Sequence, residues 1–478
     1  MKLKRVLAMT MAAVMTVSLA ACGGGDDSTT GGGDSQSPVS DDGGADVEQP
    51  EGIISYTDLD LDSDCKDITA TVSFFNNRTD LDADDYAGTN WKQYVEAFNE
   101  LYPNITVDIL TSTDYDGDAQ THLQSGEYES VMCIPTMDKA DMEAYFYAYG
   151  DYDTISQTIN YADNSMYNNI VYGIPSTVNA SGIVYNKKVF EGAGITELPK
   201  TPDEFIDAMK KIKETYGDSV DPYYTNYAAG WALSGQWDGF IGIPATGDNT
   251  YKNQKLAHTQ DPFKDYGDDT HAYALYKLLY DMVAEGVTED DYTTTDWEGC
   301  KPRMNNGEIG AMVLGSWALP QMKAAGDNPD DVGYMPFPIT IDGKQYAGAS
   351  ADRGYGINAN LEGDDLQAAI IFVKWLVECS GYAYNEYSLP VVKGADTQLS
   401  FDNMEMLVDE PVIAGEEDLM NLLNADSEVN IDQDDGSRLQ RVIEHAANGD
   451  MTYDEIVAEW NEAWTSAQEA NGVEVSYE

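Results

Sequence analysis

The spacing of apolar residues between positions 68 and 109 constrains the fold of this 478-residue chain more than any other feature. Residues 68–75 are rich in β-forming types that alternate loosely, which predicts a strand. Apolar residues then recur at helical spacing over 91–101, Pro103 ends that helix, and residues 105–109 alternate again. A strand, a helix and a second strand with short connections form the βαβ unit of a parallel sheet. We therefore predict an α/β fold.

The same two periods return along the rest of the chain. Residues 182–185 and 310–314 are predicted strands. Thr201-Pro202-Asp203-Glu204 places a cap, a proline and a capping-box glutamate at the start of a helix. Further helices are predicted over residues 273–283, 368–377 and 453–467. About 400 residues follow the N-terminal region, too many for one small core, so we expect two lobes.

The first 22 residues resemble a bacterial lipoprotein signal. Lys2, Lys4 and Arg5 precede an apolar stretch too short to span a membrane as a mature helix, and it ends in Leu19-Ala20-Ala21-Cys22. The resemblance implies that residues 1–21 are removed and that Cys22 carries two or more lipid chains. We expect a protein anchored on the extracytoplasmic face of the cell membrane. An ordinary secretory signal with a chance cysteine is the alternative.

Residues 22–65 are predicted to form a disordered tether. Gly, Ser, Asp, Thr and Pro dominate this stretch, and no aromatic residue precedes Tyr56. Such a composition buries too little apolar surface to offset the entropy of ordering. A flexible chain of this length spans on the order of 35 Å, enough to lift a domain clear of the lipid head groups.

The charge excludes some classes of partner. The formal net charge is −59, with 85 acidic and 26 basic residues. Nucleic acid requires clustered Lys and Arg, and anionic lipid repels an acidic surface, so neither is an expected partner. Excess carboxylate more often keeps a surface solvated than it binds a cationic ligand.

Cysteine and histidine give no metal or cofactor motif. After Cys22, the remaining cysteines Cys65, Cys133, Cys300 and Cys379 are widely spaced and form no C-x-x-C pair. Their disulfide state stays open. The segment Asp80-x-Asp82-x-Asp84 starts like a calcium loop, but an aspartate follows where the turn needs glycine. We expect no metal site and no cofactor.

A series of short segments along the chain points to a family, although each segment alone is weak evidence. In chain order these are Phe98-Asn99-Glu100-Leu101-Tyr102-Pro103-Asn104-Ile105, Tyr172-Gly173-Ile174-Pro175, Gly182-Ile183-Val184-Tyr185-Asn186-Lys187, Asn306-Gly307-Glu308-Ile309-Gly310-Ala311-Met312, Gly315-Ser316-Trp317, Asp331-Val332-Gly333-Tyr334-Met335-Pro336, Gly354-Tyr355-Gly356-Ile357 and Ser388-Leu389-Pro390-Val391. Their order and spacing resemble the extracellular solute-binding proteins of the carbohydrate, maltose-binding-protein-like type.

This resemblance implies a two-lobe periplasmic-binding-protein fold of type II, with a hinge that the chain crosses three times. On this basis lobe 1 holds residues 66–175 plus 354–400, and lobe 2 holds 180–350 plus 405–478. Such a protein is a monomer that binds an oligosaccharide between its lobes and hands it to the permease subunits of an ABC importer. Closure of the lobes over the ligand is a hinge motion.

The resemblance and the residue types together predict a sugar site. A sugar needs flat aromatic rings to stack on and charged or amide groups for its hydroxyls. Trp317 matches the family tryptophan, and Trp231 and Trp237 with Gln236 are expected on a loop between helices, although each tryptophan has core packing as its alternative. The other predicted contacts follow the first strand or lie at the crossings: Asn76, Arg78, Asn179, Asp352 and Arg353. Asp352 and Arg353 either bind sugar hydroxyls or pair with each other.

Two rival functions stay open. A surface glycoside hydrolase needs two carboxylates at a defined separation, and no pair among the acidic residues is specified. No G-x-S-x-G elbow or Walker loop is present either, so we do not expect an enzyme. A binding lipoprotein for a polyamine or a peptide is the second alternative, because its ligand would suit the acid excess.

Overall fold

The structure is a computed structural model that describes residues 47, 49–84, 86–398, 404–410, 413, 415–431 and 436–477. The predicted signal, Cys22 and the first part of the predicted tether lie outside the described residues. Within the described part, no helix is both long and apolar enough to span a membrane.

The first lobe is built on a five-stranded sheet with the order β2-β1-β3-β14-β7. Its strands are β1 (Ala70–Asn76), β2 (Ile105–Thr111), β3 (Val131–Cys133), β7 (Ile174–Pro175) and β14 (Gly354–Ile357). Strand β1 is parallel to β2 and β3, whereas β14 is antiparallel to β3 and β7. Helix α1 (Trp91–Leu101) connects β1 to β2 and starts with a capping box between Asn90 and Gln93. The predicted strand, helix and strand are confirmed.

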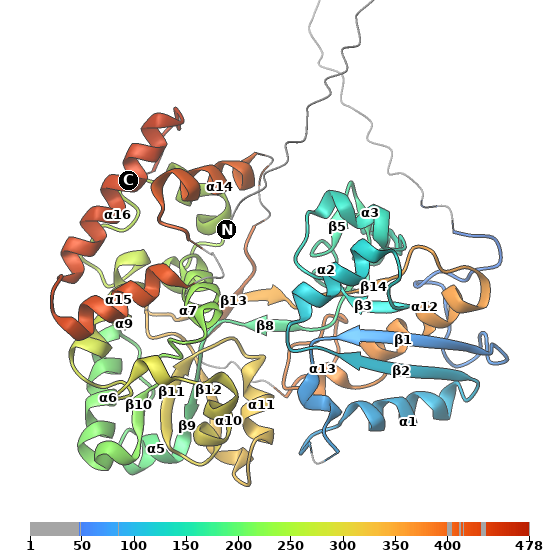
Figure 1. Ribbon diagram of the computed structural model, residues 1–478, viewed down its shortest axis with the longest axis horizontal. Helices are drawn as coiled ribbons and strands as arrows, with labels where there is room; N and C mark the ends of the chain where they lie inside the picture. The colour runs from blue at the N-terminus through green and yellow to red at the C-terminus, as the bar shows by residue number, and fades with distance from the viewer. Residues whose placement is uncertain are drawn as a thin grey trace, which may run out of the picture. The chain divides into compact units, whose positions relative to one another are not determined.

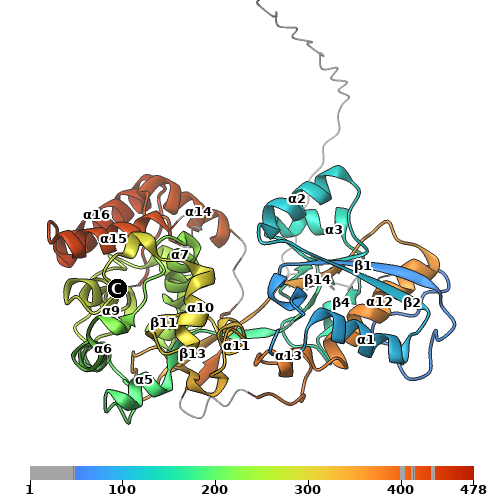
Figure 2. The same cartoon turned by 60° about the horizontal axis from the view of Figure 1, so that its bottom comes forward.

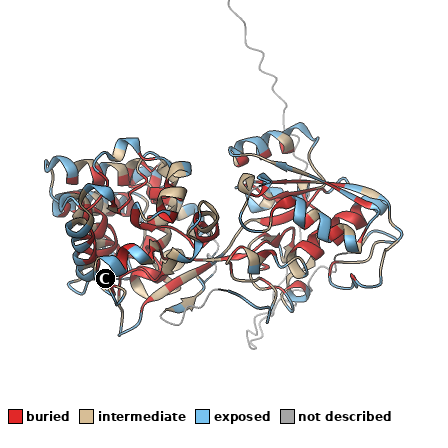
Figure 3. Ribbon diagram, turned by 90° about the horizontal axis from the view of Figure 1, so that it is seen from below, coloured by how far each residue is buried: buried red, intermediate tan, exposed pale blue. Residues whose placement is uncertain are grey.

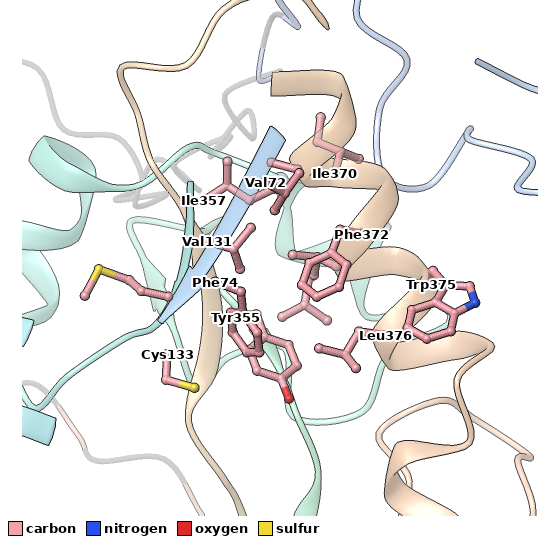
Figure 4. Close-up of a cluster of buried hydrophobic side chains, with 14 of the residues drawn as sticks. Val72, Phe74, Val131, Cys133, Tyr355, Ile357, Ile370, Phe372, Trp375 and Leu376 are labelled. Carbon is pink, nitrogen blue, oxygen red and sulfur yellow. The ribbon is translucent and has the colours of Figure 1, made fainter. Parts of the chain in front are cut away.

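Helix α12 (Gly363–Glu378) covers β1 and contributes nine buried residues to the first core. Figure 4 shows its apolar side chains against those of the sheet. The ring of Phe74 lies 5.4 Å from Tyr355 and 5.5 Å from both Phe372 and Trp91, measured between ring centroids. Edge-to-face pairs of this kind stabilise a core beyond the area they bury.

The second lobe has a four-stranded sheet with the order β10-β11-β9-β12. The strands are β9 (Ile183–Asn186), β10 (Asp221–Tyr223), β11 (Ile309–Val313) and β12 (Val332–Met335). Helix α6 (Pro202–Tyr216) starts where the sequence predicts, because the Thr201 hydroxyl accepts a hydrogen bond from the N–H of Glu204. Helices α9 (His271–Ala284), α15 (Ser437–Asn448) and α16 (Tyr453–Ala470) complete this core. Figure 3 shows buried residues along both sheets.

A third sheet links the two lobes. It has the order β15-β13-β8, from β8 (Val178–Ala180), β13 (Tyr346–Ala351) and β15 (Glu405–Leu407) (Figure 1). The chain leaves the first sheet at β7 and enters the second through β8, returns from β12 to β14 through β13, and passes over once more toward β15. The predicted type II fold with three crossings is confirmed, while the exact lobe boundaries stay a prediction.

Shorter elements complete the fold. They are α2 (Tyr115–Ser125), α3 (Met142–Tyr145), β4 (Gly150–Asp151), α4 (Tyr152–Ile155), β5 (Met166–Tyr167), β6 (Ile170–Val171), α5 (Lys187–Gly192), α8 (Ile243–Thr246), α13 (Tyr382–Asn385) and α14 (Glu416–Ser427). Helix α14 packs against α16 in the second lobe (Figure 2).

The predicted tether ends earlier than residue 65. Residues 53–66, which we call the N-terminal strap, pack on the first lobe, and Tyr56 is 0 % exposed there. The N–H of Ile54 donates to Oε1 of Gln367 at 2.7 Å, which fixes the strap to α12. The prediction of disorder is therefore wrong for this segment. Tyr56, Leu59 and Leu61 are buried there, and Ile53 and Ile54 pack against the same core partly buried, although aspartates dominate the composition around them.

Candidate functional site

The carboxyl end of β1 opens onto a small cavity in the first lobe. Its volume is about 20 Å³, and its lining includes Asn76, Arg78, Asp352 and Arg353. A space of this size holds one water molecule or one hydroxyl group. The structure thus brings together four of the residues that the sequence predicts as ligand contacts.

Arg78 is held by protein groups on every side of its guanidinium. It donates to both carboxylate oxygens of Asp80 at 2.9 and 2.8 Å, to the Tyr382 hydroxyl at 3.0 Å and to Glu386. Burial opposes its charge, but Tyr382 and the two carboxylates outweigh burial and hold its pKa well above the ordinary value. Arg78 therefore braces α13 against the end of β1.

Asn76 is also committed to the backbone around it. The residue is 1 % exposed, its side-chain oxygen accepts from the N–H of Arg78 at 2.9 Å, and its amide donates to the carbonyl of Leu110 at 3.4 Å. It shapes the cavity wall and positions Arg78.

Arg353 and Asp352 do not pair through their side chains, so that predicted alternative is wrong. The Arg353 guanidinium donates to both oxygens of Asp116, at 2.9 and 2.6 Å. Asp352 accepts from the backbone N–H of Arg353 at 2.7 Å and from the amide of Asn179 at 3.3 Å. Asn179 and Asp352 belong to β8 and to the end of β13, so this contact connects the first and second crossings.

Three tryptophans form a cluster in the second lobe. Trp231 lies on α7 (Gly230–Trp237), Trp297 starts α10 (Trp297–Asn305), and Trp317 precedes α11 (Ala318–Ala324). Their ring centroids are 5.2 Å (Trp231 to Trp297), 5.8 Å (Trp231 to Trp317) and 5.5 Å (Trp297 to Trp317) apart. All three are half-buried, so each keeps part of its ring surface accessible. We call these residues the tryptophan cluster.

The local sequence explains the position of Trp317. A Cβ atom added to Gly315 would lie 2.6 Å from the indole of Trp317, so only glycine lets the ring fold back over the chain. The N–H of Gly315 donates to Oε1 of Gln236 at 2.7 Å, which ties this turn to α7. Gln236 therefore positions the cluster.

Trp237 does not belong to the cluster. It is 1 % exposed and packs edge-on against Tyr223 and Phe337 in the second core. The expected loop is the helix α7, and a helix turns Trp231 and Trp237 to different faces because they are six residues apart. Such a buried ring has no face free for a sugar to stack on. The alternative prediction, that Trp237 packs in the core, fits the structure.

Trp297 is absent from the predicted set. It occupies the first position of α10, where the Asp296 side chain caps the helix by accepting from the N–H of Gly299 at 2.9 Å. The sequence held one signal here: Asp296 is a residue type that caps helices, which indicates that a helix starts at Trp297. Its proximity to Trp231 and Trp317 depends on tertiary packing and is not visible in the sequence.

Two interactions connect residues of the two lobes near the small cavity and the tryptophan cluster. One is a cation–π contact of Lys323, and the other is the attraction of Lys301 for Asp80. Lys323 on α11 lies 4.9 Å from the ring centroid of Tyr387, which follows the Arg78 partner Glu386. Burial would raise the pKa of Asp80, but Arg78 outweighs it and, with a smaller contribution from Lys301 on α10, lowers that pKa.

A larger cavity of about 760 Å³ has lining residues from both lobes. The first lobe contributes Lys139, Tyr152 and Asp163, and the second contributes Asp409 and Met420, among others. Tyr152 is its only aromatic residue, so this cavity offers less surface for stacking than the tryptophan cluster does.

The described residues hold no group of three or more histidine, cysteine or acidic side chains placed to bind a metal ion. Cys65, Cys133, Cys300 and Cys379 are all free thiols in the structure.

Two α/β lobes, three crossings and a half-buried aromatic cluster in one lobe define a binding protein of the type II periplasmic class. Residues 84–378 match the family model of bacterial extracellular solute-binding proteins, and the chain belongs to that family.

Solved structures and a curated relative extend this assignment. The chain is similar to a manno-oligosaccharide specific solute-binding protein of Bifidobacterium animalis subsp. lactis in complex with mannotriose, with 46 % identity, a TM-score of 0.80 and coverage of 87 % of this chain and 99 % of that one. An ABC-transporter binding protein of the same organism, in complex with mannobiose, gives 48 % identity, a TM-score of 0.80 and the same coverage. The multiple sugar-binding protein of Streptococcus mutans is 27 % identical over 66 % of this chain and 72 % of its own length.

Proposed function

We propose that this protein is a membrane-anchored receptor that binds a manno-oligosaccharide and delivers it to an ABC importer. The observation that carries the proposal is the tryptophan cluster in a chain 46–48 % identical to binding proteins solved with mannotriose and mannobiose. Sugar rings present apolar C–H faces, and half-buried indoles bind such faces while their edges stay near water.

The first lobe supplies the polar side of the proposed site. The small cavity at the end of β1 accommodates a single hydroxyl group, and the carboxylate of Asp352 lines it. Asn76, Arg78, Arg353 and Asn179 act in this proposal by holding the surroundings of this cavity in place, and Gln236 holds the turn before Trp317 in the second lobe. Their hydrogen bonds to protein groups keep them in one geometry, which lowers the entropy lost on binding.

The anchor and the tether give the receptor its location. In this proposal residues 1–21 are removed, Cys22 carries the lipid, and the chain up to the N-terminal strap links the lipid to the first lobe. A tethered receptor has a raised effective concentration near the permease subunits. A glycoside hydrolase and a receptor for polyamines or peptides are the alternatives that the experiment has to separate.

A thermal-unfolding screen of the purified protein tests the proposal directly. Mannobiose and mannotriose at about 100 times Kd are expected to add roughly 2.7 kcal/mol of apparent stability, and chromatography should recover them intact. A shortened sugar would establish hydrolysis instead, and stabilisation by polyamines or peptides alone would remove the carbohydrate assignment.

Substitution of the cluster locates the site. Trp317→Ala and Trp297→Ala should each weaken mannobiose binding by tenfold or more, or about 1.4 kcal/mol, because each removes a stacking surface. Trp460→Ala is the matched control, since Trp460 is also half-buried in the second lobe but packs on Phe263 and Tyr276. Equal affinity in the wild type and both cluster variants, by titration calorimetry, would move the site elsewhere.

A further inference from the structure

Asn226 is a buried asparagine whose side-chain amide forms no hydrogen bond within the described residues. It lies in the loop between β10 and α7, is 2 % exposed, and neither Oδ1 nor Nδ2 has a hydrogen-bond partner there. Buried amide groups in native proteins are almost always paired, so an unpaired one calls for an explanation. Its φ of +57° is left-handed, a conformation that asparagine tolerates better than other side-chain-bearing residues.

The loop around Asn226 is fixed without help from that side chain. The N–H of Thr225 donates to Glu289 at 2.9 Å, and the amide of Gln440 donates to the carbonyl of Tyr227 at 2.9 Å. The Asn226 carbonyl accepts from Ala229 at 3.0 Å. The backbone is therefore held on both sides of Asn226, and the amide is not what shapes the loop.

The same loop is connected to the chain next to two members of the tryptophan cluster. It ends at Gly230, directly before Trp231, and the N–H of Ala228 donates at 2.8 Å to the hydroxyl of Thr295, two residues before Trp297. Asn226 thus lies in a loop that is fixed next to two of the three tryptophans, at the carboxyl end of a strand of a largely open α/β sheet, where ligands bind in such folds.

We infer that Asn226 hydrogen-bonds hydroxyl groups of the saccharide that stacks on the tryptophan cluster; this inference rests on the proposed function. A carboxamide offers one acceptor and two donor hydrogens, which suits a pair of neighbouring hydroxyls. Its polar atoms are covered in the structure, so ligand binding must shift the side chains over them. The amide pairs with the ligand and not with the protein. The folded protein therefore does not need this amide for its own stability, and Asn226 is a binding residue.

The test separates binding from stability. Asn226→Gly keeps the left-handed backbone and removes the amide, and Asn168→Gly is the matched control at an exposed asparagine with φ of +50°. We expect the unliganded Asn226→Gly protein to melt no lower than the wild type, because it loses an unpaired buried group. Its affinity for mannobiose should fall at least tenfold, whereas Asn168→Gly should match the wild type in both measurements.

Deoxy analogues of mannobiose identify the contact itself. Removal of the hydroxyl that Asn226 binds should weaken wild-type binding and leave Asn226→Gly binding unchanged, a coupling that a loosened loop does not produce. A lower melting temperature with affinity within twofold of wild type, or the absence of such coupling for every hydroxyl, would overturn the inference. If the wild type binds no mannobiose at all, the result contradicts the proposed function itself and not only the role of Asn226.

Discussion

Glu289 is a buried carboxyl group at the base of the loop that carries Asn226. It is 8 % exposed and accepts hydrogen bonds from the backbone N–H and the hydroxyl of Thr225. Burial raises its pKa from 4.5 to about 7, and the nearby charge of Asp221 adds to this, although the Thr225 hydrogen bonds oppose it. The folded protein therefore keeps a proton on Glu289 that the unfolded chain has already released above pH 4.5.

This difference predicts the pH dependence of stability. Between pH 4.5 and about 7 the folded state binds more protons than the unfolded state, so this group's contribution to stability falls as pH rises and is constant above pH 7. The wild type should lose on the order of 3 kcal/mol of stability from this group across the window, and Glu289→Gln should not show that loss. Denaturant unfolding at each pH measures it, with the exposed Glu462→Gln as the control. Parallel pH curves for the wild type and Glu289→Gln would contradict the prediction.

Individual site residues were predictable only where the chain itself holds the signal. Trp317 follows a glycine whose missing Cβ makes room for the indole, and that glycine is visible in the sequence. One partner of Arg78 is Glu386, 308 residues away, and no local pattern connects them. Trp297 was missed for the same reason, because its neighbours Trp231 and Trp317 meet it only after folding.

Among the elements, helices with caps and regular periodicity were predictable, whereas short or glycine-rich ones were not. Thr201 and Glu204 mark the start of α6, and the structure confirms it. Helix α7 has no side-chain cap and includes Gly230 and Gly235, so its sequence reads as a loop. Its helical form comes from packing on α15, where Gly436 lies against the backbone of Gly230.

The contribution of the N-terminal strap to the free energy of unfolding can be tested directly. Tyr56 is fully buried against Tyr149, with ring centroids 5.6 Å apart, and Lys374 of α12 lies over its ring. Tyr56→Ala should destabilise the protein by about 3–5 kcal/mol, as removal of a buried aromatic ring does. Denaturant unfolding measures the loss, and hydrogen exchange should show faster exchange at the Ile54 amide.

Tyr384→Ala is the control for the strap, because Tyr384 is a large exposed residue of α13. Its stability should stay within about 0.5 kcal/mol of the wild type. If Tyr56→Ala costs less than about 1 kcal/mol, the strap rests on the lobe without contributing to its core, and the tether extends to residue 65 as the sequence predicts.

At the scale of the whole molecule, the order of the crossings followed from sequence but the pairing between them did not. The strands β8, β13 and β15 are too short and too far apart in the chain to predict their shared sheet. The family resemblance supplied their order. The register is set by the antiparallel pairing of β13 with β8, in which the N–H of Asp352 donates to the carbonyl of Thr177 and Ala349 lies opposite Ala180.

The net charge of −59 predicts that the stability of the molecule as a whole depends on salt. Repulsion among exposed carboxylates opposes the compact state, and salt shortens its range from about 30 Å at 0.01 M to about 8 Å at 0.15 M. The melting temperature should therefore rise between these salt concentrations, and an uncharged osmolyte at equal osmolality is the control. An unchanged melting temperature would contradict the prediction that repulsion among the carboxylates limits stability.

Salt also separates the proposed ligand from its cationic rival. Mannobiose is neutral, so its Kd should change by less than twofold over the same range, whereas attraction of a polyamine to an acidic protein weakens as salt screens it. Titration calorimetry at both salt concentrations measures this difference on one sample. A saccharide affinity that falls steeply with salt would show that the charge of the protein takes part in recognition, which stacking on the tryptophan cluster and hydrogen bonding to neutral hydroxyls do not require.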